Sequence, residues 1–118
     1  MPLMIATIAG RVLLAMLFVL AGIAKLTGPQ PFAAHMAAHR LPAVLLPVVA
    51  AFELGTGTAL LIGWQLPLAA GALALFCLAT AFVFHFNFTE KAERTLFFKD
   101  MALAGALVVI AAGALPVR

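Results

Sequence analysis

Five ionisable residues interrupt the long apolar runs of this chain and are its best candidates for chemistry. They are Arg11, Glu53, His85, Lys99 and Asp100. A charged side chain at the centre of a bilayer costs about 2.5–3.5 kcal/mol, so such groups usually face the interior of a helical bundle and find partners there. We therefore predict that these five residues line a ligand-binding site.

Depth along the apolar runs divides the five residues into two layers. At a rise of 1.5 Å per residue, Arg11 and Glu53 lie roughly 10–15 Å below the rim that carries the chain termini. We predict that they pair, either as a salt bridge that fixes helix register or as the polar floor of a ligand cavity. His85, Lys99 and Asp100 lie within roughly one or two helical turns of the opposite rim, which carries the longer loops.

His85 has two interpretations. It is either an interfacial histidine bonded to a backbone carbonyl, or a hydrogen-bond donor and proton-relay group for a bound head group. Asp100 is predicted at a similar depth, where it can orient the imidazole or share its proton. For Lys99 we expect a side chain that extends to the loop-side surface.

The elements that position these groups are transmembrane helices. The chain has 118 residues, of which 66% are hydrophobic and 9% charged, a composition that excludes a soluble globular domain. A helix needs about 20 apolar residues to cross a hydrocarbon core about 30 Å thick. We predict an all-α fold, a four-helix transmembrane bundle with short loops that forms one domain over 1–118. Its spans cover about 3–24, 43–63, 67–86 and 96–115, and a short interfacial helix within Pro31–Arg40 joins the first two.

Small residues recur every fourth position in the second predicted span. This stripe consists of Ala51, Gly55, Ala59 and Gly63. Such a pattern lets another helix approach closely, and we expect it to serve core packing, while a contact with a second subunit remains open.

Charge placement gives the membrane orientation and excludes one class of partner. The net charge is +3, but the basic residues are scattered or flank apolar runs, so we expect no nucleic-acid binding. Four of them gather at the loop-side rim: Lys25, Arg40, Lys91 and Arg94. By the positive-inside rule this rim is cytoplasmic, and both termini are predicted to be non-cytoplasmic. The segment Thr89–Arg94 is expected to be solvated.

Metal and covalent redox sites find little support in the sequence. Cys77 is the single cysteine, so a CxxC pair or a cysteine metal cage is impossible. His35 and His39 have the i, i+4 spacing of two metal ligands, yet no nearby residue supplies a third, and we predict no metal site. Any electron carrier must come from elsewhere, and no covalently bound cofactor is expected.

The chain resembles the DoxX family of small bacterial membrane proteins. The agreement includes Arg11, the stretch FVLAGIAK at Phe18–Lys25, Leu41-Pro42, FELGTG at Phe52–Gly57, Gly63, HFNF at His85–Phe88 and FFKD at Phe97–Asp100. The resemblance implies a multi-pass protein of the bacterial inner membrane. Members of the family have been linked to thiosulfate oxidation coupled to quinone, and to a membrane assembly with sulfur-transfer and superoxide-detoxifying partners, while many others have no assigned activity.

Three functions are compatible with these features. The leading hypothesis is a membrane subunit that binds a lipophilic redox molecule such as a quinone and supports a partner oxidoreductase. Nothing in the chain marks it as an active oxidoreductase by itself. The alternative is a non-catalytic scaffold or assembly subunit whose basic rim docks a partner. The partners that we expect are the lipid bilayer and either a redox enzyme or further copies of the chain. A small transporter or proton path is the third, although no inverted repeat or broken central helix is evident.

Overall fold

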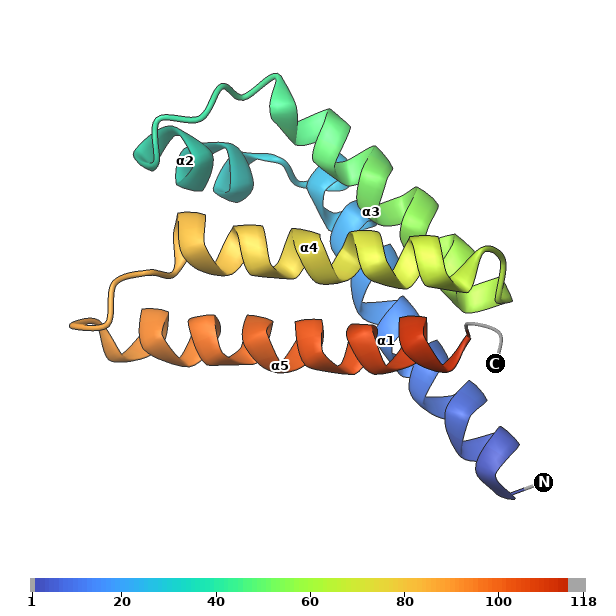
Figure 1. The fold of residues 1–118 in the computed structure, drawn as a ribbon. Coiled ribbons are helices and arrows are strands. Elements are labelled where there is room, and N and C mark those ends of the chain that lie inside the picture. The colour runs from blue at the N-terminus through green and yellow to red at the C-terminus, as the bar shows by residue number, and fades with distance from the viewer. Residues whose placement is uncertain (1, 115–118) are drawn as a thin grey trace. The chain divides into compact units, whose positions relative to one another are not determined.

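The computed structural model describes residues 2–114, and all of these residues lie in helices or in the turns that connect them (Figure 1). The helices are α1 (Pro2–Thr27), α2 (Gln30–Ala38), α3 (Leu45–Ile62), α4 (Leu66–Phe84) and α5 (Lys91–Gly113). All but α2 are long and apolar enough to cross a membrane. This confirms the all-α fold class, with four membrane-spanning helices and a short helix between the first two.

The helix bounds depart from the predicted spans mainly in the last helix. α5 begins at Lys91, five residues before the predicted span at 96, so part of the segment Thr89–Arg94 is helical. Most of this segment is exposed, in agreement with the expectation that it is solvated. The helix continues to Gly113, and the predicted end of this span at Leu115 lies outside the described residues. As a result, Glu93 lies in the first turn of a helix, on a defined face.

The chain divides into two compact units, Met1–Trp64 and Gln65–Arg118. We call them the N-terminal hairpin, made of α1 and α3 with α2 in their connection, and the C-terminal hairpin, made of α4 and α5. A single domain over 1–118 stays a prediction.

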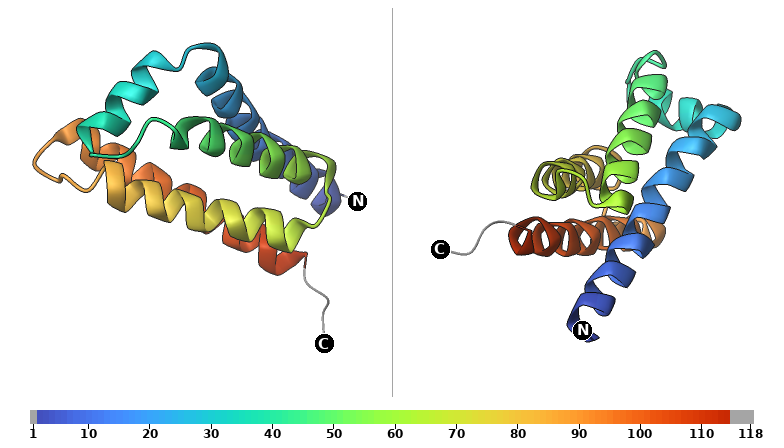
Figure 2. Two further views of the ribbon diagram at one scale, coloured as in Figure 1. Left: turned by 90° about the horizontal axis from the view of Figure 1, so that it is seen from above. Right: turned by 90° about the vertical axis from the view of Figure 1, so that its right-hand side faces the viewer.

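Glycine allows close packing in the N-terminal hairpin, where α1 lies against α3 (Figure 2). A Cβ atom added at Gly22 would lie 3.0 Å from the carbonyl oxygen of Ala50, and one added at Gly57 would lie 3.2 Å from the backbone nitrogen of Val19. Since neither glycine has a side chain, the two backbones approach each other at both points. These two contacts fix the register of the antiparallel pair.

The predicted stripe of small residues on α3 does not form the close approach between α1 and α3. Ala51 and Gly55 are exposed, and a Cβ atom at Gly55 would meet nothing within 4 Å. Gly57 makes the close approach instead, because the face of α3 that packs is the one that carries Ala50 and Leu60.

The C-terminal hairpin packs through small and aliphatic side chains, with an aromatic cluster at its loop end. α4 and α5 lie side by side (Figure 1). Phe97 is buried, and its ring lies 5.2 Å from that of Phe82, 5.8 Å from that of Phe86 and 5.0 Å from that of Phe88. Edge-to-face and tilted ring pairs at these distances stabilise packing. We call Phe82, Phe86, Phe88 and Phe97 the aromatic cluster, and it lies at the loop end of the C-terminal hairpin.

A tight turn joins α3 to α4. Gly63 ends α3 in the left-handed conformation, with φ of 82°, and Gln65 precedes α4 with φ of 50°. The backbone N–H of Trp64 donates to the carbonyl of Ala59 at 2.8 Å, a bond typical of a helix that ends at a left-handed residue. The Trp64 side chain is exposed, as expected for an aromatic residue at the membrane interface.

Candidate functional site

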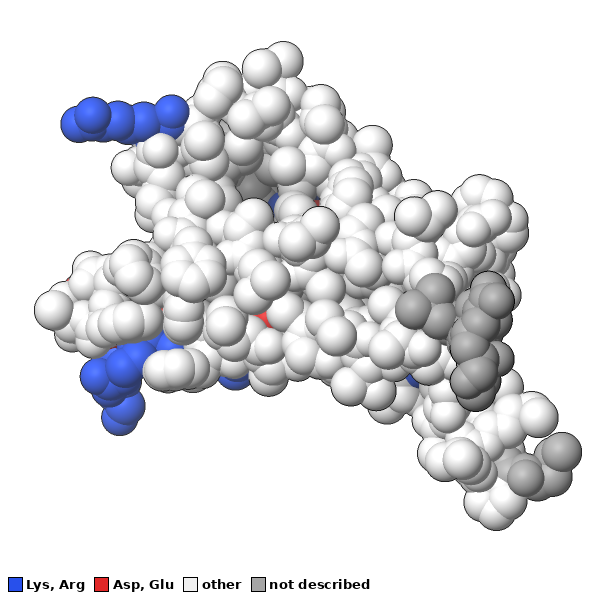
Figure 3. Space-filling model, viewed as in Figure 1, with Lys and Arg blue, Asp and Glu red and all other residues white. Residues whose placement is uncertain are grey.

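Polar side chains form one cluster in each hairpin. In the N-terminal hairpin, Lys25 of α1 pairs with Glu53 of α3. In the C-terminal hairpin a chain of four residues joins α4 to α5, and we call it the polar chain: Glu93, His85, Asp100 and Thr80. Most other side chains on the face shown in Figure 3 are uncharged, as expected for helices that face lipid.

The Lys25–Glu53 pair is a close and buried contact. Lys25 Nζ lies 2.7 Å from Glu53 Oε1, and the Glu53 residue is only 3% exposed. The same ammonium group lies 4.9 Å from the centroid of the Phe32 ring of α2, within cation–π distance. The pair therefore links α1, α2 and α3 at the loop end of this hairpin.

The predicted pairing of Arg11 with Glu53 is wrong. Glu53 lies between residues 50 and 54 of α3, and both of these contact Gly22. Gly22 follows Arg11 by 11 residues, about 16 Å along the helix axis. An arginine side chain does not cross that distance, whereas Lys25 is one turn away from Gly22. The prediction placed Arg11 and Glu53 at one level by counting residues from the ends of the apolar runs. This count was wrong because α1 and α3 extend unequally beyond the place where they pack together.

Arg11 instead lies at the C-terminal end of α3. Its guanidinium atoms are 3.3–3.5 Å from the position of a Cβ atom at Gly63. Its buried Nε has no hydrogen-bond partner within the described part of the chain. A cation at this place interacts favourably with the partial negative charge of the helix C-terminus. The ligand contacts proposed for Arg11 and Glu53 stay predictions.

His85 is the centre of the polar chain. It follows the last residue of α4, and its Nδ1 lies 2.9 Å from Glu93 Oε2 in the first turn of α5. Its Nε2 lies 3.9 Å from Asp100 Oδ2. Glu93 and Asp100 are seven residues apart, two helical turns, so both carboxylates lie on the face of α5 that meets α4. The imidazole is therefore held between two carboxylates.

Thr80 completes the polar chain on the side away from the loop. Its hydroxyl lies 3.2 Å from Asp100 Oδ2 and 3.0 Å from the carbonyl oxygen of Cys77. A hydroxyl has a single hydrogen, so it donates to one of these two oxygens at a time. His85 and Asp100 are thus brought together as predicted. Thr80 and Glu93 are members of the same chain that sequence reasoning missed.

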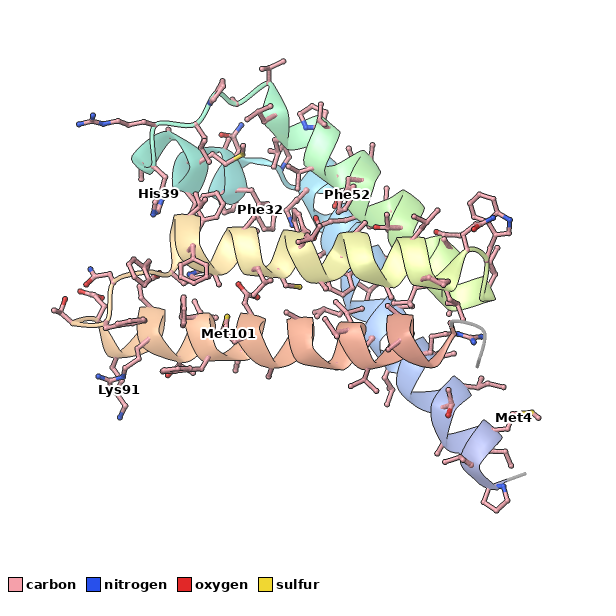
Figure 4. All side chains as sticks on the ribbon, viewed as in Figure 1. Met4, Phe32, His39, Phe52, Lys91 and Met101 are labelled. Carbon is pink, nitrogen blue, oxygen red and sulfur yellow. The ribbon has the colours of Figure 1, made fainter. Side chains whose placement is uncertain are left out.

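Lys99 takes no part in the polar chain. It is exposed, and no ion pair joins it to another residue between 2 and 114. Lys91, at the start of α5, also points away from α4 (Figure 4). The expectation that Lys99 extends outward agrees with this exposure, and its predicted ligand contact stays a prediction.

The two hairpins share one layout. In each, a nitrogen group at the end of the first helix, Lys25 or His85, faces an acid in the third turn of the second helix, Glu53 or Asp100. His35 and His39 lie on and just after α2, where His39 Nδ1 is 3.0 Å from the carbonyl oxygen of His35. Among residues 2–114, no three His, Cys, Asp or Glu side chains gather as a metal site would require.

Comparison with known proteins gives the family. The family model of DoxX matches residues 6–86, which include Lys25, Glu53, Thr80 and His85. The chain belongs to the DoxX family. The DoxX chain is also 35% identical over 107 residues to inner membrane protein YqjF of Escherichia coli (strain K12), an alignment that covers 91% of this chain and 82% of that relative. No solved structure gives a significant match.

Proposed function

We propose that this DoxX protein is a membrane subunit that binds a lipophilic redox molecule such as a quinone at His85 and supports a partner oxidoreductase. The observation that carries the proposal is His85 fixed between Glu93 and Asp100, next in the sequence to Phe86 of the aromatic cluster. The resemblance to family members linked to quinone-coupled oxidation points to the same class of ligand.

The geometry gives each nitrogen of His85 a separate task. Nδ1 is engaged by Glu93 at 2.9 Å, which fixes the ring orientation. The other ring nitrogen, Nε2, lies 3.9 Å from Asp100 Oδ2, and we assign the contact with the ligand oxygen to this side of the ring. A ring N–H donates a hydrogen bond to a quinone carbonyl.

The aromatic cluster suits the remainder of such a ligand. Phe82 is 53% exposed and Phe86 is 59% exposed, and their rings are 5.4 Å apart. Exposed aromatic faces beside a few convergent polar groups are typical of sites for flat apolar ligands. In this proposal the quinone ring lies against these two phenylalanines and its oxygen contacts His85, which precedes Phe86 in the sequence.

Electrons for the ligand must come from a partner protein. The chain contains one cysteine and therefore no cysteine pair for redox exchange. The partner in this proposal is an oxidoreductase that exchanges electrons with the bound quinone, while the DoxX chain holds the ligand in the membrane.

Ligand-induced stabilisation tests this function. Short-chain ubiquinone and a menaquinone analogue are added to purified wild type, to His85→Ala and to His35→Ala, and thermal unfolding is recorded. A ligand that binds only the folded state raises the midpoint. We expect stabilisation of wild type and His35→Ala, and loss of it in His85→Ala. An unchanged midpoint in all three proteins with both quinones rules the function out.

A scaffold function is the second candidate, and the exposed basic residues favour it. Arg40, Lys91 and Arg94 are all exposed at the loop ends of the hairpins, where they can dock an acidic surface. In that case charge reversal of these residues abolishes co-purification of a defined enzyme, while His85→Ala retains it.

A further inference from the structure

We propose that the outer face of α5 binds an anionic phospholipid, with a preference for one that carries two phosphate groups. The outer face is the side of α5 that points away from α4 at the loop end of the helix, and we define it by four residues: Lys91, Arg94, Phe98 and Lys99. This inference does not depend on the ligand proposed for His85.

The spacing of the four residues puts them on one side of the helix. Counted from Lys91, the other three follow after three, seven and eight residues, and residues at these intervals lie above one another on an α-helix. All four are exposed, and Lys91 points away from α4 (Figure 4). The two acids of α5, Glu93 and Asp100, lie on the opposite side, where they contact His85 and Thr80.

The outer face carries positive charge that the protein itself does not neutralise. Lys and Arg side chains gather where α5 begins (Figure 3), and none of Lys91, Arg94 and Lys99 forms an ion pair with another residue between 2 and 114. Glu90, the residue before α5, is also exposed, and three cations with one acid leave a net charge of +2. A phospholipid with two phosphate groups carries the charge that matches this surplus.

The depth of the cations favours a lipid over an acidic protein. Lys91 and Lys99 are eight residues apart, about 12 Å along the helix axis, so the cations extend from the loop into the membrane-spanning helix. Side chains of a helix tilt toward its N-terminus, so the Lys99 ammonium group reaches back toward the head groups of the bilayer. A protein that docks from water contacts only the start of α5, whereas a phospholipid lies along this whole stretch.

Apolar groups continue the outer face toward the middle of the membrane, at the level of the acyl chains. Phe98 is 59% exposed, and its ring is stacked on that of Phe88, with 6.2 Å between the centroids and 5° between the planes. One turn further along, the same face carries Ala102, Gly105 and Ala106, which are all exposed. Since none of these three has a side chain larger than a methyl group, an acyl chain can lie close to the helix below the cations.

The positive-inside rule also favours basic residues at this rim, but it counts charges and does not require them to share a helix face. Arg40 separates the two effects. It is an exposed cation in the connection from α2 to α3, outside α5. Orientation in the membrane depends on Arg40 as much as on Lys99, whereas the proposed lipid site depends on Lys99 alone.

Native mass spectrometry of the purified full-length protein in detergent measures lipid binding directly. Cardiolipin, phosphatidylglycerol and phosphatidylcholine are titrated separately, and the dissociation constant of the first bound lipid is obtained for each. Each charge at such a surface changes the affinity by about fivefold. We therefore expect wild type to bind cardiolipin about fivefold more tightly than phosphatidylglycerol, and phosphatidylcholine most weakly.

Single substitutions locate the site. Lys99→Gln removes one cation of the outer face, and we expect it to weaken cardiolipin binding by about fivefold. Lys91→Gln, at the other end of the face, should weaken it by a similar factor and gives a second variant. Lys99→Arg keeps the charge and should bind as wild type does. Arg40→Gln removes one cation outside α5 and is the matched control, with the affinity of wild type.

Two results would overturn the proposal. One is equal affinity of wild type for the three lipids, which would assign these cations to an acidic protein partner or to membrane orientation alone. The other is equal weakening by Lys99→Gln and Arg40→Gln, because the rim would then attract lipids only through its total charge. No quinone is added in these titrations, so a failure of quinone binding in the thermal assay leaves their outcome unaffected.

Discussion

Lys25 Nζ lies 2.7 Å from Glu53 Oε1, where the last turn of α1 packs against α3. The Glu53 side chain is 4% exposed, so its carboxylate is almost completely removed from solvent. An ion pair in this environment owes its stability to the presence of both partners, because a lone buried charge is strongly unfavourable. Lys25 and Glu53 should therefore behave as a unit when they are mutated.

We expect Lys25→Met to lower the free energy of unfolding by about 3–5 kcal/mol, since it leaves Glu53 buried without its cation. The double variant Lys25→Met/Glu53→Gln should lose much less than the sum of its single variants. Denaturant unfolding in mixed micelles measures both. Lys99→Met is the control, because Lys99 is exposed and makes no ion pair within residues 2–114. Equal losses for Lys25→Met and Lys99→Met would show that the pair is not structurally coupled.

The glycine contacts give a second prediction. Gly22→Ala puts a Cβ atom 3.0 Å from the Ala50 oxygen, and Gly57→Ala puts one 3.2 Å from the Val19 nitrogen. We expect each to destabilise the N-terminal hairpin by about 1–3 kcal/mol through overpacking.

Gly55→Ala is the matched control for the glycine variants. It lies on the same helix as Gly57, but its added methyl group meets nothing within 4 Å. It should be neutral or stabilise the protein by about 0.5–1 kcal/mol, because alanine favours a helix. If Gly55→Ala destabilises the protein as much as Gly57→Ala, the register described for α1 and α3 is incorrect.

Hydropathy was sufficient to predict the four spanning helices and the short helix between the first two. Each helix has enough apolar residues to cross a bilayer, and breakers such as Gly28-Pro29 separate α1 from α2. The pairing inside the helices was harder. Which residue faces Glu53 depends on where Gly22 and Gly57 allow the backbones to meet, and this register is a property of tertiary packing.

The polar chain was predictable only in part. His85 and Asp100 were correctly predicted to lie together, because both are at a similar depth in their helices. Glu93 was missed because four charged residues between Glu90 and Arg94 resemble a solvated loop, although the seven-residue spacing of Glu93 and Asp100 was a usable signal for one helical face. Thr80 carried no signal, since a threonine within an apolar helix usually bonds its own backbone.

Membrane orientation gives a third prediction. Four basic residues lie in or next to the connections from α1 to α3 and from α4 to α5: Lys25, Arg40, Lys91 and Arg94. We therefore expect these connections to be cytoplasmic and both termini to be on the opposite side. Single cysteines are introduced at Gln30, Gln65 and Thr89 in a Cys77→Ala background and labelled in intact spheroplasts with an impermeant maleimide. Only the cysteine at position 65 should react. Labelling at 30 and 89 but not at 65 would show that the orientation is the opposite of the predicted one.

The central claim is that His85 of the polar chain holds a quinone, and native mass spectrometry tests it most directly. Wild type, His85→Ala and His35→Ala are released gently from the membrane in which they were made, and the mass of each intact protein and its bound lipids is recorded. We predict a quinone on wild type and His35→Ala that is absent from His85→Ala. Wild type without quinone, or quinone retained equally by His85→Ala, would contradict the claim.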